Sequence, residues 1–328
     1  TPATWPANPT TASAGTTPNN FVVALRHVYF SSARDGGVAS FGYDLDGKCT
    51  TNDPTASCTS TNGVTDLPNG VDDESITLMG TLVSLASTLS DDAVNGDIAA
   101  GNFDILFRIL SYNGATDVPL SKGMQVAVQA SPGIVGAGPA KFDGTDQWTV
   151  SIDDSLSPTS TYPAAQLVKN AYVANGTLVM TLNSTLTIHV VLPAPALVSG
   201  PLAIILHQPT ITAKLVPNGT GWDLTDGLIV GRWSTSDILA NVASLSIDAG
   251  GPVDSLCDHA GGSIFTLVTT KVCTDTDITA AGPDDNTHPC DAVSVAVGFD
   301  GVAADVAGNP VPFPTSSTPC SHDAGNCN

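Results

Sequence analysis

The chain has 328 residues and a formal net charge of −21, from 31 acidic and 10 basic residues. Such an acidic surface repels phosphate backbones and anionic lipid headgroups, which argues against nucleic acid as a partner. Apolar residues make up 42% of the chain, too many for a disordered protein, and Thr, Val, Ser and Gly outnumber the helix-forming Glu, Lys and Arg, which favours strands joined by tight turns.

The first twenty residues carry no charge and consist mainly of Pro, Thr, Ala and Asn. This composition is typical of a spacer, so we expect residues 1–20 to form a flexible tether between an anchor and the folded body. We also expect any export signal to have been removed before Thr1. The folded part is predicted to begin with a strand-like apolar run at Phe21–Phe30.

Residues 44–73 form an acidic loop rich in Gly, Asn, Asp and Thr. At 44–47 the stretch DLDG places two carboxylates on one side of an extended segment, and its glycine lets the chain turn around an ion. Calcium takes about six to eight oxygen ligands, which such a loop supplies. The predicted calcium ligands are Asp44, Asp46, Asp66, Asn69, Asp72 and Asp73. The alternative is that these residues make ordinary Asx turns in a solvated loop.

A helix is expected from Glu74 to Leu89, because apolar residues recur there at helical spacing and acidic residues stand at its start. From 101 to 223, short β-prone runs alternate with turn signals and no helical crossover separates them. This pattern predicts an antiparallel β-sandwich, jelly-roll-like, or a related barrel. The most apolar stretch, Leu186–Leu206, is broken by prolines; it predicts two buried strands around a turn and no membrane span.

The last third of the chain has a mixed pattern. Ser234–Leu245 predicts a short helix capped by a serine, Ser263–Val272 fits helix better than strand, and Asp291–Val306 alternates like a strand. We expect residues 21–233 to form the β-sandwich body, including the acidic loop. Residues 234–328 form a disulfide-braced part that belongs either to the same domain or to a small one of its own.

Seven cysteines lie in two loop-like regions without a CxxC motif, which favours disulfides and leaves one cysteine over. The candidates are Cys49, Cys58, Cys273, Cys290, Cys320 and Cys327. Cys49–Cys58, Cys273–Cys290 and Cys320–Cys327 are plausible pairs, although sequence does not determine connectivity. An alternative is a zinc or copper site, since thiolate and imidazole are preferred ligands of these metals. Its residues would be Cys257, His259, His288 and Cys290.

Several stretches together resemble a group of secreted proteins and lipoproteins of myxobacteria for which no activity is established. They are GYDLDG followed by NGVDDES, then ILFRILSYNGATDVPL, FDGTDQWTV, LTDGLIVGRWSTSDILA and PCDAVSVAVGF. The resemblance covers most of residues 41–305. In that group the loop ends in GVDN, whereas this chain has Asp73 in place of the asparagine. The resemblance implies an envelope or extracellular location, as a tethered surface protein.

The chain contains no GxSxG, HExxH or P-loop motif, so an enzyme is not the leading interpretation. The leading hypothesis is an exported calcium-binding protein with a non-catalytic binding, adhesive or assembly role. Its partner would be an extracellular carbohydrate, a protein or further copies of itself. The alternatives are a secreted hydrolase with a structural calcium and a Cys/His protein that binds zinc or copper.

Overall fold

The computed structural model describes residues 4–30, 41–50, 57–60, 62–85, 87–136, 138–152, 167–182, 185–192, 198–219, 221–248, 254–258, 263–314 and 327. His259 and Cys320 lie outside these ranges. The helices are α1 (Ser75–Leu85), α2 (Asp91–Ala100), α3 (Thr235–Ala243) and α4 (Ser263–Thr274), with 3-10 turns at Ser87–Leu89 and Leu120–Lys122. The strands are β1 (Asn19–Tyr29), β2 (Asp104–Tyr112), β3 (Gln125–Ser131), β4 (Gln147–Trp148), β5 (Leu167–Val168), β6 (Ala171–Ala174), β7 (Thr177–Thr181), β8 (Thr185–Leu192), β9 (Val198–Asn218), β10 (Gly221–Ser234), β11 (Ser246–Ile247), β12 (Asp254–Ser255) and β13 (Ala292–Val306).

The strands form one sheet, so the predicted mainly β, antiparallel fold is confirmed. Its longest path runs β12-β11-β9-β10-β13-β1-β2-β3-β5, with β4 paired to β13, β6 to β7, and both β7 and β8 to β9. Every pairing between these strands is antiparallel except that of β4 with β13. Because β13 lies between β10 and β1, the C-terminal part shares its sheet with the rest of the body.

The longest strand, β9, changes partners along its length. Its first part pairs with β8 and β11, and its second part with β7 and β10. Leu186 of β8 lies opposite Leu206, which confirms the two buried strands predicted there. The register between β9 and β10 shifts around Gln208 and Pro209, which makes a β-bulge at this point.

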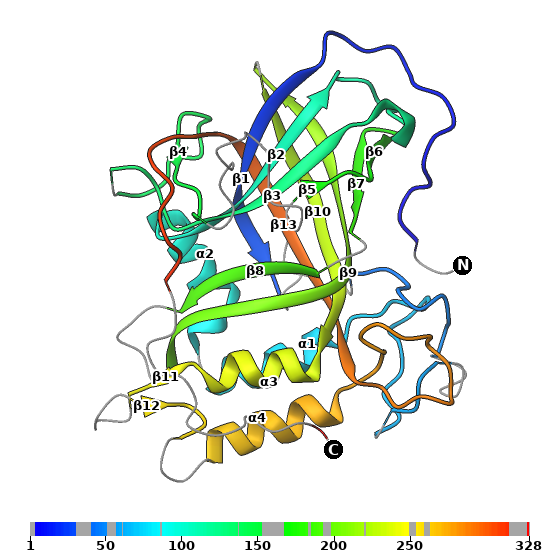
Figure 1. The fold of residues 1–328 in the computed structure, drawn as a ribbon, viewed down its shortest axis with the longest axis vertical. Helices are drawn as coiled ribbons and strands as arrows, with labels where there is room; N and C mark the ends of the chain where they lie inside the picture. The colour runs from blue at the N-terminus through cyan, green and yellow to red at the C-terminus, as the bar shows by residue number, and fades with distance from the viewer. Residues whose placement is uncertain are drawn as a thin grey trace.

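In the view of Figure 1, β8 and the first part of β9 run across the direction of the main strands. Side chains of these two strands and of β1, β2 and β13 belong to one buried apolar cluster. At its centre Phe107 and Phe299 stack with their ring centroids 5.3 Å apart, and both are fully buried. Burial of apolar area on this scale is the main stabilising contribution to the fold.

The helices follow local signals to different degrees. The expected helices at Ser234–Leu245 and Ser263–Val272 are present as α3 and α4, and Ser234 caps α3 by accepting from the amide of Asp237 at 3.1 Å. The helix expected at Glu74–Leu89 is divided into α1 and a 3-10 turn. Helix α2 was not expected, because Val94 and Ile98 are its buried residues and so short an apolar face leaves little periodic signal.

Residues 4–18 lie along the body, which differs from the free tether expected for residues 1–20. The amide of Ser13 donates to the carbonyl of Asp117 at 3.0 Å, and the hydroxyl of Tyr172 donates to the carbonyl of Pro6 at 2.5 Å. A stretch without charges can dock in this way because its backbone supplies the hydrogen bonds.

The disulfides do not follow the pairs expected from sequence proximity. Cys58 bonds to Cys290 across 232 residues, and Cys273 bonds to Cys327 across 54. The expected pairs Cys49–Cys58, Cys273–Cys290 and Cys320–Cys327 are therefore wrong, and Cys49 is free and exposed. The reason is that the fold brings the acidic loop against the segment that precedes β13, which places Cys58 beside Cys290.

Candidate metal centre

The turn at the start of the acidic loop is built by its own side chains. Gly47 has a φ of 73° and donates its amide to Oδ1 of Asp44 at 2.7 Å. The amide of Lys48 donates to Oδ1 of Asp46 at 2.7 Å. The Asp46–Lys48 contact is an Asx turn, and the Asp44–Gly47 contact closes the same turn over three residues. The turn presents the carboxylates of Asp44 and Asp46 to the same space.

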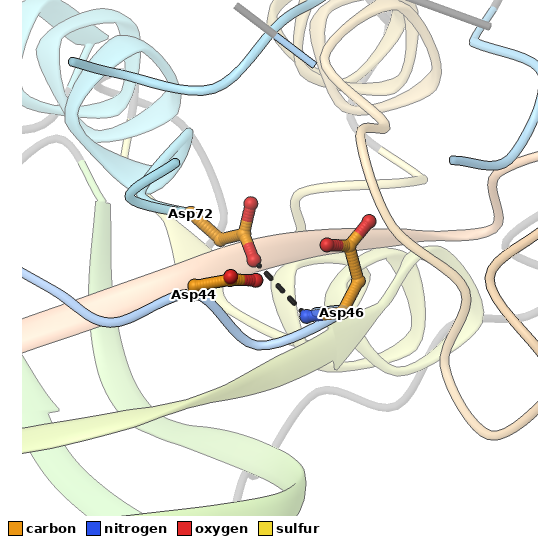
Figure 2. Close-up of side chains that lie close together, drawn as sticks. All are labelled: Asp44, Asp46 and Asp72. Carbon is orange, nitrogen blue, oxygen red and sulfur yellow. Dashed lines mark hydrogen bonds between the residues drawn. The ribbon is translucent and has the colours of Figure 1, made fainter. Parts of the chain in front are cut away.

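Asp72 reaches this turn from the segment that leads into α1. Its Oδ2 accepts from the amides of Leu45 at 2.6 Å and Asp46 at 3.3 Å. Its own amide donates to the carbonyl of Tyr43 at 3.1 Å. Figure 2 shows the carboxylate of Asp72 beside that of Asp44, with the carboxylate of Asp46 facing them.

We call Asp44, Asp46 and Asp72 the acidic triad. Each contributes an oxygen, and these oxygens lie within 4.8 Å of one another. Three of the predicted calcium ligands are thus brought together from two separate parts of the loop. The remaining ligands that calcium requires would come from backbone carbonyls and water.

Burial controls the charge of the triad. It raises the pKa of Asp72 to about 9, and the nearby charges of Asp46 and Asp277 act in the same direction. Burial is also the main cause of the raised pKa values of Asp44 and Asp46. Buried carboxylates at this spacing ionise together only when a positive charge compensates them. A divalent cation would supply that charge.

Arg232 of β10 approaches the triad, but its guanidinium is engaged with other partners. It donates to the carbonyl of Leu45 at 2.8 Å and to the carbonyl of Thr279 at 2.7 Å. It also forms an ion pair with Asp284 at 2.7 Å, and both side chains of that pair are only 7% exposed. Arg232 therefore neutralises Asp284 and positions Leu45, which leaves the triad without a bonded cationic side chain among the described residues.

Asp73, at the end of the acidic loop, and Asp277, which follows α4, both bond to β13. Asp73 accepts from the hydroxyl of Ser75 and from the amide of Ala296 at 3.2 Å. Asp277 accepts from the amide of Ser294 at 2.8 Å and from its hydroxyl. Burial raises the pKa of Asp73 well above its usual value and that of Asp277 to about 7. Asp73, a predicted calcium ligand, thus bonds to the backbone of a neighbouring strand.

The other two predicted ligands lie outside the triad. The carboxylate of Asp66 accepts from the amide of Thr50 at 2.6 Å and from its hydroxyl. Asn69 is exposed, with a φ of 70°, in the tight turn that joins Leu67 to Val71. These positions fit the alternative interpretation as ordinary turn residues.

The candidate zinc or copper site does not retain its thiolates. Cys257 and Cys290 are both disulfide-bonded, and a disulfide sulfur is not the thiolate that binds these metals. The ring of His288 hydrogen-bonds to Asp285 at 2.8 Å on the exposed surface. The two cysteines of this candidate site are therefore not available as thiolate ligands.

Sequence reasoning missed Asp277, Arg232 and Asp284 as parts of this region. Asp275 and Asp277 stand two positions apart, directly after the helix predicted at Ser263–Val272. In an extended segment, residues at this spacing point to the same side of the chain. Nothing local shows that this side meets the acidic loop, because the contact depends on the position of β13.

The fold and the site define a disulfide-bonded, antiparallel β protein with a largely buried triad of carboxylates that could hold a metal ion. No protein-family model, curated protein or solved structure matches the chain. Among the helices that the structure describes, none has the length and apolar character needed to cross a membrane.

Proposed function

We propose that this protein is an exported calcium-binding protein that binds a partner and does not catalyse a reaction. The observation that carries the proposal is the acidic triad, which closes the turn at 43–48 onto the segment that leads into α1. An ion at the triad would hold these two segments together. Its role would be structural, since it offsets the repulsion between buried carboxylates.

Calcium fits the donor set better than other metals. The triad offers oxygen atoms alone, which excludes the nitrogen and sulfur ligands that zinc and copper prefer. Calcium accepts irregular sets of carboxylates, carbonyls and waters, whereas magnesium requires nearly ideal octahedral geometry. The three aspartates, completed by carbonyls and waters, would supply such an irregular set.

Disulfides support the extracellular part of the proposal. Cys58–Cys290 and Cys273–Cys327 are bonds that persist in oxidising compartments. The resemblance to secreted proteins and lipoproteins suggests the same location, on the outer surface or beyond it. An acidic surface is also compatible with divalent cations in that environment.

The burial of the triad supports a binding role over hydrolysis. Asp44 is 8% exposed and Asp72 is 3% exposed, so neither presents its carboxylate to a substrate in an open cleft. A cavity lined by Trp5 does exist nearby, but the described residues that line it include no carboxylate. A glycosidase needs two carboxylates on either side of the bond it cleaves.

The test is elemental analysis of the purified protein together with thermal unfolding with and without a calcium chelator. The proposal predicts that calcium co-purifies and that chelation lowers the melting temperature until calcium is added back. Magnesium at the same concentration should restore less of the loss. A protein that contains no calcium and melts identically in chelator would contradict the proposal.

A further inference from the structure

A cavity of about 440 Å³ lies next to the acidic turn, where the end of β7 meets the bulge in β9. Its size is within the usual range of small-ligand pockets, about 300–1,000 Å³. The residues of its wall that matter here are Trp5, Leu45, Thr181, Gln208, Thr210 and Arg232. They come from the N-terminal segment, the acidic loop, β7, β9 and β10, so only the folded chain assembles them.

Gln208 has an unusual backbone conformation at the wall of this cavity. Its φ is 48°, in the left-handed region that glycine, asparagine and aspartate favour and glutamine rarely adopts. It stands in the bulge of β9, and bulges redirect side chains out of the regular alternation of a strand. The Gln208 side chain is exposed, and its amide offers both a donor and an acceptor.

Trp5 forms the aromatic part of the wall and is held in place from two sides. Its ring meets that of Tyr43 edge to face, with centroids 5.5 Å apart and planes at 83°. The next residue, Pro6, accepts a 2.5 Å hydrogen bond from the hydroxyl of Tyr172. Trp5 is only partly buried, so the indole keeps apolar surface for a ligand.

The charge of the cavity wall is close to neutral. Arg232 is the charged residue in the wall, and its guanidinium is already paired with Asp284 at 2.7 Å and bonded to the carbonyl of Leu45 at 2.8 Å. Among the described wall residues, the other polar side chains are those of Gln208, Thr181 and Thr210, and Thr210 is only 1% exposed. Such a wall favours neither an anion nor a cation. It matches a neutral ligand with many hydroxyl groups and one flat apolar face.

We propose that this cavity binds one ring of a neutral saccharide. The apolar face of the ring stacks on Trp5, and its hydroxyls bond to the side-chain amide of Gln208 and to the hydroxyl of Thr181. The proposal rests on the binding role proposed above and names its ligand class. Leu45 lies in the cavity wall and donates its amide to Asp72 at 2.6 Å, so an ion at the triad would also stabilise the cavity.

The experiment is saturation-transfer NMR on the full chain in excess calcium. The probes are glucose, galactose, mannose, xylose and N-acetylglucosamine, together with their common disaccharides. At least one probe is expected to receive saturation. Its affinity should fall by about tenfold or more in Trp5→Leu, which keeps apolar packing at the wall but removes the stacking ring.

Gln208→Gly is the second variant, since glycine adopts a positive φ without strain and preserves the bulge. It is expected to fold at least as stably as the wild type and to lose saccharide binding. Asn175→Gly is its matched control, because Asn175 has a φ of 51° and an exposed side chain at the β6–β7 turn, outside the cavity. This control should bind the saccharide as the wild type does.

Two results would overturn the saccharide proposal: no probe receives saturation, or binding persists in Trp5→Leu or in Gln208→Gly. The calcium proposal fails separately, if no calcium co-purifies and the melts are unchanged by chelator. Saccharide binding without calcium would leave the cavity proposal standing, and calcium without saccharide binding would leave only the metal centre.

Discussion

The main-chain amide of Leu45 donates a 2.6 Å hydrogen bond to Oδ2 of Asp72, 27 residues away in the chain, and the carbonyl of Leu45 accepts from Arg232 at 2.8 Å. Leu45 therefore lies between the acidic triad and the buried ion pair of Arg232 with Asp284. The peptide groups of Leu45 thus link the triad to β10 through one hydrogen bond on each side. Substitutions in the triad and in the Arg232–Asp284 pair can therefore be tested separately.

On the side of the triad, we expect Asp72→Asn to abolish the stabilisation by calcium. The amide oxygen of asparagine still accepts from the amide of Leu45, so the turn keeps its hydrogen bond. One of three carboxylates is lost, and with it much of the attraction for the ion. In chelator the melting temperature should equal or exceed that of the wild type, because a buried ionisable group has been removed. Thermal unfolding with and without calcium measures both effects.

The matched control for this variant is Asp305→Asn. Asp305 is an exposed residue of β13 and takes no part in the triad. Its substitution should leave the rise in melting temperature with calcium intact. If Asp72→Asn showed the same rise as this control, the ion would have to bind somewhere other than the triad.

On the side of β10, we expect Arg232→Met to destabilise the protein by about 3–5 kcal/mol, because it leaves the buried carboxylate of Asp284 without its partner. The exposed ion pair of Lys214 with Asp226 provides the comparison, with side chains 62% and 52% exposed. Lys214→Met should cost less than about 1 kcal/mol. Urea unfolding of both variants measures the difference, and similar costs would refute a structural role for the buried pair.

The fully buried Asp104, at the start of β2, predicts a dependence of stability on pH. Its Oδ1 accepts from the amides of Leu25 at 2.9 Å and Ile105 at 2.6 Å, and burial raises its pKa well above the usual value. The folded state therefore holds the proton more tightly than the unfolded chain. Its contribution to stability is complete below about pH 4 and is lost as the pH rises towards the folded-state pKa.

Asp104→Asn keeps an acceptor for these amides and cannot ionise. We expect it to lose less stability than the wild type between about pH 5 and pH 8. Asp104→Ala should instead cost about 1–3 kcal/mol for each buried amide left without an acceptor, at either pH. Chemical unfolding at the two pH values measures these effects. An equal loss in Asp104→Asn and the wild type would show that Asp104 does not titrate as burial predicts.

The disulfide between Cys58 and Cys290 should contribute substantially to the free energy of unfolding. Replacing both residues by serine is expected to cost about 2–5 kcal/mol, because the bond constrains an unfolded chain across 232 residues. Cys49→Ser is the control, since Cys49 is free and exposed. It should leave the melting temperature unchanged and remove a thiol that reacts with labelling reagents in the native wild type. Destabilisation by Cys49→Ser alone would contradict the pairing.

Local sequence patterns predicted much of the secondary structure and part of the site. The serine cap of α3 and the DLDG turn depend on residues a few positions apart, so short segments contain the whole signal. The strand runs between 101 and 223 were recognisable because apolar and turn residues alternate at close range. Asp44 and Asp46 were correctly placed together for the same reason.

Other features were beyond any local pattern. Helix α2 buries only two apolar residues, so periodicity is weak there. The docking of Trp5 against Tyr43 joins a segment without charges to a loop 38 positions away, and no residue of either predicts the other. Asp66 and Asn69 share the composition of the predicted ligands, yet their backbone directs them to other roles.

By itself, the sequence determined that the chain is an acidic, mainly β, antiparallel protein with a turn able to gather carboxylates, because composition and short-range periodicity carry that information. The tertiary structure alone decided that Asp72 joins that turn, that Cys58 bonds to Cys290, and that Arg232 pairs with Asp284. Each of these contacts links residues far apart in the chain. They depend on the order and register of strands, which are set when the apolar faces of the whole sheet are buried together.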